Sequence, residues 1–158
     1  MDDQTFRKAM GKFATGVTVV TTQFGEEIHG MTANAFMSVS LNPKLVLISI
    51  DHKANMIDYI NNTGKFAISI LNEGQKDISA YFAGQNQESR EIDFNWFNDM
   101  PTIKESLANL TCEVHDSVVA GDHTLYIGKV TDIKITDGEP LAFYEGKYRQ
   151  MQNGAGVN

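Results

Sequence analysis

The stretch GMTANAFMSVSLNP, residues 30–43, has the composition of a β-strand but carries an unusual polar pattern. It has no charged residue, and small polar side chains recur at alternate positions. Because successive side chains of a strand face opposite ways, we expect one face to carry an amide, two hydroxyls and an aromatic ring. The residues of this polar face are Asn34, Phe36, Ser38 and Ser40. The other face, which we expect to lie in the core, holds Ala33, Ala35, Met37, Val39 and Leu41.

An uncharged polar face of this kind suggests a ligand. An exposed strand face normally carries Lys, Glu or Thr, whereas amide and hydroxyl groups beside an aromatic ring suit a flat molecule with many hydrogen-bonding atoms. The spacing alone leaves a second interpretation open, a surface strand that happens to be rich in serine.

The segments on either side of this stretch predict further strands of an antiparallel sheet. β-Branched and other apolar residues make up most of segments 17–22, 45–50 and 66–71. Gly25, among acidic residues, predicts a hairpin turn, and Asn42-Pro43 ends the polar strand. Such short links favour antiparallel neighbours. The last third of the chain adds predicted strands at 110–119, 123–135 and 140–148.

Short helices interrupt the predicted strands without alternating with them one by one. They are predicted at residues 3–14, 54–62 and 75–84, with Thr63-Gly64 ending the second. Residues 85–100 are predicted as a loop and 150–158 as a flexible tail. This arrangement argues against repeated βαβ units. The predicted fold is mainly β, a closed antiparallel barrel with short flanking helices, formed by residues 1–158 as a single domain.

The composition excludes several classes of partner. With 20 acidic and 13 basic residues among 158, the net charge of −7 offers no basic surface for nucleic acid. No run approaches the ~18 apolar residues of a membrane helix, and the N-terminus has no signal-peptide core. The lone Cys112 cannot form an internal disulfide. We therefore expect a cytoplasmic protein that binds neither nucleic acid nor membrane.

His52 and Lys53 precede the predicted helix 54–62. Free N–H groups at a helix start, together with an ammonium and an imidazole, would bind a phosphate. A solvated basic turn is the alternative. Neither a GxGxxG sequence nor the glycine spacing of a P-loop occurs, so any nucleotide would be held by another type of scaffold.

Cys112 and His115 are the pair that would first suggest a nucleophile or a metal site. An offset of three residues places them on opposite faces of a strand, and the other histidines are scattered. We therefore predict no metal.

Four motifs of the chain closely resemble the short-chain flavin reductases of two-component aromatic hydroxylases. They are FRKAMGKFATGVTVVTT, HGMTANAFMSVSLNPKLVLISI, FAGQ and AGDHTLYIGKV, and the resemblance runs from about residue 4 to Gln150. It is particularly near to the reductases that partner phenol or 4-hydroxyphenylacetate hydroxylases. The resemblance implies an FMN-binding split barrel, a Greek-key β-barrel with flanking helices, acting as a homodimer.

The resemblance also implies roles for individual residues. The strand segment that would lie along the flavin ring holds Asn34, Ala35, Phe36 and Met37. The segment that would bind the ribityl and phosphate groups holds Ser49, Ile50, Asp51, His52, Lys53 and Ala54, and Ala83 is a further flavin contact. The nicotinamide contacts fall on Ser38, His123, Phe143, Tyr144, Glu145 and Gly146. Ser40 is added on the facing argument alone.

The function implied is an NAD(P)H:flavin oxidoreductase that transfers a hydride from NADH to FMN or FAD. The reduced flavin would supply a separate aromatic-hydroxylating monooxygenase. The cofactors carry this reaction, so we expect His123 to orient the nicotinamide. Two alternatives remain open at this point: a split-barrel oxidase with tightly held flavin, and a non-enzymatic flavin- or haem-binding barrel. The sequence also leaves open the choice of FMN or FAD and of NADH or NADPH.

Overall fold

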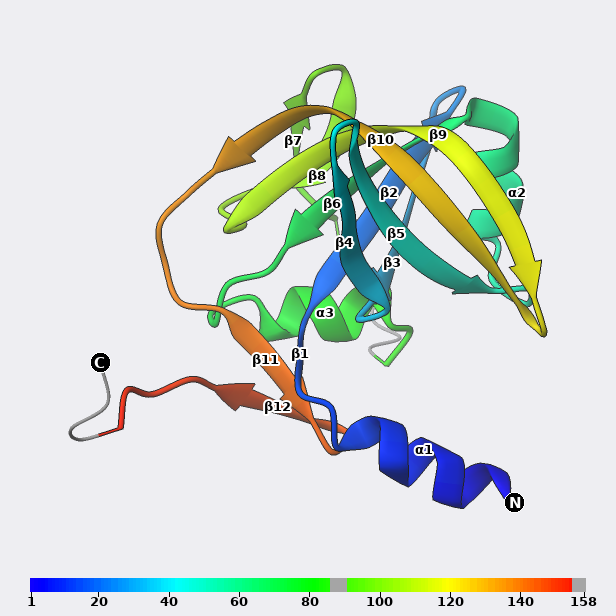
Figure 1. The fold of residues 1–158 in the computed structure, drawn as a ribbon. Coiled ribbons are helices and arrows are strands. Elements are labelled where there is room, and N and C mark those ends of the chain that lie inside the picture. The colour runs from blue at the N-terminus through cyan, green and yellow to red at the C-terminus, as the bar shows by residue number, and fades with distance from the viewer. Residues whose placement is uncertain (86–90, 155–158) are drawn as a thin grey trace.

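The computed structural model describes residues 1–85 and 91–154, and Figure 1 shows their arrangement. Short helices flank a mainly β structure, as the sequence predicts. The helices are α1 (Asp3–Gly11), α2 (Met56–Thr63) and α3 (Lys76–Phe82). The strands are β1 (Thr15–Gly16), β2 (Thr18–Phe24), β3 (Glu27–Ala33), β4 (Phe36–Leu41), β5 (Lys44–Asp51), β6 (Lys65–Ile70), β7 (Phe94–Phe97), β8 (Met100–Ile103), β9 (Ala108–Ala120), β10 (His123–Ile135), β11 (Leu141–Tyr144) and β12 (Lys147–Gln150). No helix in the described ranges combines the length and apolarity needed to cross a membrane.

A strongly curved seven-stranded sheet forms the body of the molecule (Figure 1). Its order is β3-β2-β6-β9-β10-β5-β4, and the pairings along it are antiparallel. The two edge strands, β3 and β4, are consecutive in the chain and are joined by Asn34 and Ala35. A three-stranded sheet, β1-β11-β12, lies beside α1. The predicted class of antiparallel, mainly β fold is confirmed.

The core lies inside the curved sheet and is closed by α2. Phe66, Ile48 and Ile60 are fully buried there. Tyr126 is also buried, and its hydroxyl donates to Asn61 Oδ1 at 2.8 Å, which satisfies its polar group. α2 contributes Met56 and Ile60, four residues apart on one helical face. The helix ends, as predicted, at Gly64, whose left-handed backbone (φ 66°) lets its N–H donate to Ile60 O.

The prediction that residues 30–43 form one continuous strand is wrong. The chain leaves the sheet at Asn34 and Ala35, and β4 then pairs with β5 with Phe36 opposite Ile48 and Met37 opposite Leu47. A β-bulge follows, because Ser38 pairs with Val46 but Ser40 pairs with Leu45, leaving Val39 as the extra residue.

These two interruptions overturn the predicted faces of the strand. Phe36 packs against the core, whereas Met37 and Leu41 of the predicted core face are 54% and 79% exposed. The bulge places Ser40 on the same face as Met37, and Ser38 lies on the opposite face. A simple alternation of faces therefore does not describe this segment, since one extra residue reverses it.

The predicted loop 85–100 contains a strand that the sequence analysis missed. β7 and β8 form a hairpin whose turn residues, Asn98 and Asp99, both have positive φ. Residues 86–90 of the predicted loop lie outside the described residues. The predicted strand 140–148 is likewise a hairpin, β11–β12, turning at Glu145 and Gly146. Of the predicted tail, Gln150 belongs to β12 and residues 155–158 lie outside the described residues.

Candidate functional site

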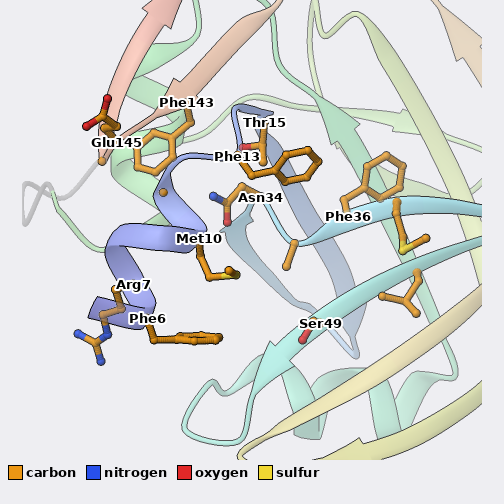
Figure 2. Close-up of a pocket in the computed structure, with 15 residues that line it drawn as sticks. Phe6, Arg7, Met10, Phe13, Thr15, Asn34, Phe36, Ser49, Phe143 and Glu145 are labelled. Atoms are coloured by element: carbon orange, nitrogen blue, oxygen red, sulfur yellow. The ribbon is translucent and has the colours of Figure 1, made fainter. Parts of the chain in front are cut away.

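A cleft of about 660 Å3 lies between α1 and the edge of the sheet where β3 passes into β4 (Figure 2). Its volume is in the range of small-molecule and cofactor sites. The residues come from both ends and the middle of the chain. They are Phe6, Arg7, Met10, Gly11, Phe13, Thr15, Asn34, Ala35, Phe36, Met37, Leu47, Ser49, Phe143, Glu145 and Gly146.

One wall of the cleft is the apolar side of α1. The helix begins at the N-cap Asp2, whose carboxylate accepts a hydrogen bond from Thr5 N at 2.7 Å, and this bond lowers the pKa of Asp2. No residue of α1 is buried. Phe6 and Met10 on its cleft side are 54% and 56% exposed, and Phe13, just after the helix, is 79% exposed. A surface helix normally buries such an apolar stripe against the protein core. Here the stripe faces the cleft.

The end of α1 is held by the β11–β12 turn. Glu145 N donates to Gly11 O at 3.0 Å, and Lys12 Nζ lies 3.1 Å from Glu145 Oε2. The Lys12 ammonium lowers the pKa of the Glu145 carboxyl, and both groups are exposed to solvent. The turn therefore closes the cleft at the end nearest the helix C-terminus.

The opposite wall is the uncharged surface of β4 and β5. Met37 and Leu47 are cross-strand partners and present flat apolar area, while Asn34 and Ser49 add an amide and a hydroxyl. The irregular connection is fixed by its backbone, because Phe36 N donates to Asn34 O at 3.0 Å and Ser49 N to Ala35 O at 3.2 Å. This surface suits a planar ring with a polar edge.

Thr15 provides a further polar group in the cleft. It lies in β1, opposite Phe143 of β11. Its Oγ1 is the one buried side-chain polar atom within residues 1–85 and 91–154 that has no hydrogen-bond partner in the chain. A buried hydroxyl of this kind is rarely left unpaired, so the cleft fits a ligand that supplies an acceptor there.

Three of the residues predicted for the phosphate segment, Asp51, His52 and Lys53, form a second group with His123, a predicted nicotinamide contact. His123 is the cross-strand partner of Asp51. Asp51 lies two positions beyond Ser49 on the same face of β5, so the two residues are about 7 Å apart along the strand. His52 Nε2 lies 3.0 Å from Thr124 Oγ1. Together these residues form a polar cluster, which we define as Asp51, His52, Lys53, Asp122, His123 and Thr124.

Hydrogen bonds within the polar cluster fix its backbone and one histidine. His123 Nδ1 lies 2.7 Å from Asp122 Oδ1, and this hydrogen bond lowers the pKa of Asp122. The helix predicted at 54–62 begins later in the chain, and the N–H groups of His52 and Lys53 are paired within the fold. His52 N donates to Asp122 O, Lys53 N donates to Asp51 Oδ1, and the helix begins only at Met56. The Lys53 ammonium and the His52 imidazole are the side-chain groups that the cluster offers a phosphate.

A second cavity of about 120 Å3 adjoins the cleft, since Asn34 and Phe143 line both. It contains Ala83, which the resemblance assigned to flavin. Ser79 Oγ and Tyr148 OH lie 2.7 Å apart at its wall. Ala83 is therefore near the cleft but separated from its main space by Asn34 and Phe143.

Several predicted residues do not line either cavity. Ile50 is fully buried in the core, and Ala54 packs against the core. Tyr144 has the Arg149 guanidinium 5.7 Å from its ring centroid. Ser38 and Ser40 also lie outside the cleft lining. The alternation argument, on which Ser40 alone was selected, fails at the bulge.

Other cleft residues were missed by the sequence analysis, namely Phe6, Arg7, Met10, Gly11, Phe13, Thr15 and Leu47. The sequence did indicate some of these residues, because the motif FRKAMGKFATG, quoted for the family resemblance, contains all of them except Leu47. Nothing local in that motif shows that the helix turns its apolar side toward a strand far along the chain.

Cys112 and His115 of β9 differ in their surroundings, and a β-bulge falls at His115, because Gly128 pairs with Val114 but Ile127 pairs with Asp116. Cys112 is 2% exposed and burial raises the pKa of its thiol to about 12, whereas His115 is exposed. The thiol therefore stays protonated and unreactive near neutral pH.

Comparison with known proteins identifies the family. Residues 10–152 match the family described as Flavin reductase like domain. An NADH-dependent flavin reductase from a Rhodococcus species is 47% identical over 92% of this chain and 85% of that protein. The reductase component of 4-hydroxyphenylacetate 3-monooxygenase from Thermus thermophilus is 36% identical over 94% of this chain and 96% of that protein.

A solved structure gives the same result. The flavin reductase PheA2 in its native state matches with a TM-score of 0.95 and 56% identity, covering 97% of this chain and 100% of that one. The chain therefore belongs to the flavin reductase-like domain family.

Proposed function

We propose that the protein is an NAD(P)H:flavin oxidoreductase that transfers a hydride from NADH to FMN or FAD and releases reduced flavin. One observation carries the proposal. Residues 34–37, assigned to the flavin, and Phe143, Glu145 and Gly146, assigned to the nicotinamide, line the same cleft although they are far apart in the chain. Membership of the family and the NADH-dependent activity named for its relatives support this assignment.

The residues of the cleft fit binding and orientation. When bound, reduced nicotinamide supplies the hydride and the flavin ring accepts it, so the protein needs little acid–base chemistry of its own. Met37 and Leu47 give the ring an apolar surface, and Asn34 gives its edge an uncharged polar group. The apolar side of α1 forms the opposite wall and would reduce the access of water to a bound ring.

The polar cluster fits the other two parts of the ligands. Lys53 and His52 offer charge-assisted hydrogen bonds to a phosphate. His123 is held by Asp122 through Nδ1, which leaves Nε2 for the nicotinamide carboxamide. Because the cluster starts about 7 Å from Ser49, a flavin ring in the cleft could extend its ribityl chain toward Lys53.

The test is steady oxidation of NADH by the purified protein, with and without added FMN, FAD or riboflavin. We expect turnover only when a flavin is added, and replacing NADH by NADPH defines the donor. A protein that stays yellow through dialysis and consumes oxygen without NADH would instead be a flavoprotein oxidase. If the protein bound flavin but did not oxidise NADH, it would instead be a non-enzymatic flavin carrier or sensor.

We further propose that the reduced flavin is used by a separate aromatic-hydroxylating monooxygenase. The Thermus thermophilus relative, named as the reductase component of such an enzyme, supports this proposal. The test combines a purified hydroxylase of that class, its aromatic substrate, NADH and flavin. Hydroxylated product should form only when this protein is present, and product formed without it would remove the proposed role.

The exposed apolar surface favours a homodimer. Outside the cleft lining, Val39 and Leu41 of β4 and Ile135 of β10 remain exposed in the single chain. A second copy that covered this surface would bury more than about 1,000 Å2, as stable interfaces do. Sedimentation at assay concentration should show a dimer, whereas a fully active monomer would contradict the proposal.

We also infer one domain in a cytoplasmic setting. The family match spans residues 10–152 without interruption, which supports a single domain. The buried free thiol of Cys112 fits a reducing compartment. Limited proteolysis should leave one stable core, and two separable fragments would contradict the single domain.

A further inference from the structure

The hydroxyl of Thr15 differs from those of other buried threonines in this chain. Thr18 Oγ1 donates to Ala33 O at 2.6 Å, and Thr22 Oγ1 donates to Lys65 O at 2.8 Å. Both of these hydroxyls are satisfied within the fold. Thr15 Oγ1 is equally withdrawn from solvent but has no partner within the chain, and it lies in the wall of the cleft.

An unpaired buried hydroxyl has a free-energy cost, because it loses its hydrogen bonds to water without replacing them. The cost disappears if a ligand supplies an acceptor. Figure 2 shows Thr15 with Phe13 and Asn34 at one end of the cleft, and Phe143 lies close by as the cross-strand partner of Thr15. The residues that line this part of the cleft with Thr15 are aromatic rings and an amide, an environment that suits the edge of a ring better than a phosphate.

We propose that Thr15 positions the flavin ring by donating a hydrogen bond from Oγ1 to a carbonyl oxygen or ring nitrogen on the polar edge of the isoalloxazine. This proposal rests on the proposed function, since it takes the cleft as the flavin site. The side chains that would bind the phosphate, those of His52 and Lys53, do not line the cleft. Thr15 should therefore recognise the part of the ligand that riboflavin, FMN and FAD share.

Thr15→Val tests the proposal, because valine has nearly the shape of threonine but no hydroxyl. Titration of the oxidised flavins by fluorescence should show affinity reduced about 3- to 10-fold, the loss of one hydrogen bond, and the reduction should be the same for riboflavin, FMN and FAD. Thr15→Ser keeps the hydroxyl and should retain most of the affinity. These measurements need no NADH and do not depend on turnover.

The stability of the flavin-free protein gives a second and opposite readout. Thr15→Val removes an unsatisfied group, so its unfolding midpoint in urea should be unchanged or higher than that of the wild type. Thr18→Val is the matched control. It breaks the bond to Ala33 O and should lower the midpoint.

Three results would overturn the proposal. Wild-type flavin affinity in Thr15→Val would show that the hydroxyl does not contact the ring. A loss confined to FMN and FAD would move the contact to the phosphate. A lowered midpoint of flavin-free Thr15→Val, matching that of Thr18→Val, would show that the hydroxyl has a partner within the protein. If the wild type bound no flavin at all, the proposed function itself would fail, and that failure is seen before any variant is made.

Discussion

The core and the cleft of this molecule are built from similar residues in opposite states. In the core, Phe66 is fully buried and the hydroxyl of Tyr126 is hydrogen-bonded. In the cleft, Phe13 is largely exposed and the hydroxyl of Thr15 is unpaired. The contrast shows that the core carries the stability of the chain, whereas the cleft keeps apolar area and hydrogen-bonding capacity that only a ligand or a second copy can use.

The largest effect expected from this contrast is on stability. Phe66→Ala should lower the free energy of unfolding by about 3–5 kcal/mol, because it removes a fully buried ring and leaves a cavity. Urea unfolding followed by fluorescence measures this. Phe13→Ala is the matched substitution in the cleft and should cost much less in dilute protein. An equal loss in the two variants at all protein concentrations would break the contrast.

A smaller loss of stability is expected at Gly128, where the packed core has no room for an added methyl group. A Cβ at Gly128 would lie 2.5 Å from Phe66 Cζ and 3.0 Å from Cys112 Cβ, so Gly128→Ala should destabilise by about 1–3 kcal/mol. At Gly16, in β1 beside the cleft, a Cβ would meet nothing within 4 Å. Gly16→Ala should leave the urea midpoint unchanged or slightly raised. A neutral Gly128→Ala would mean that Phe66 can move, and the core would be less tightly packed than described.

Lys53→Ala separates the phosphate part of the site from the ring part. The variant loses a charge-assisted hydrogen bond, so FMN affinity should fall about 5- to 100-fold while riboflavin affinity stays the same. Fluorescence titration of both flavins gives the comparison. Thr15→Val should give a different pattern, because it should reduce the affinity for both flavins equally. Equal losses of FMN and riboflavin on Lys53→Ala would place the phosphate elsewhere.

The smallest effect is expected at His123, which we propose orients the nicotinamide. His123→Asn retains a donor and should keep most of the turnover, whereas His123→Ala should raise the KM for NADH a few-fold with little change in kcat. Steady-state kinetics at saturating flavin resolve the two parameters. A several-hundredfold fall in kcat in both variants, with KM unchanged, would make His123 a proton donor.

Local sequence patterns predicted the strands, helices and turns better than they predicted which side-chain faces pack together. The hairpin turn at Gly25 and the helix end at Gly64 follow from the demands of left-handed backbone, and both were predicted. The faces of β4 were not, because alternation cannot reveal that Val39 is an extra residue. The turn at Asn98 and Asp99 was a readable signal, since these residues tolerate positive φ, but it was overlooked in a polar segment.

The site was predicted where one segment provides it and missed where distant segments meet. Met37 and Ser49 come from the adjoining strands β4 and β5 and Asn34 from the connection before β4, and all three line the cleft. Thr15 and Phe13 reach the cleft because β1 pairs with β11 near the other end of the chain. No periodicity in residues 3–16 encodes that partner, so α1 was predicted as a helix without a role in the site.

The pairing of Thr15 with Phe143 also bears on the order in which the protein folds. Hairpins such as β2–β3 and β9–β10 join neighbours in the chain and can form early, whereas a contact between residues near opposite ends has the largest loop-closure entropy to overcome. We expect the core to assemble first and the cleft last. During synthesis, the chain would therefore become able to capture a flavin only after β11 has been made, when nearly the whole protein has left the ribosome.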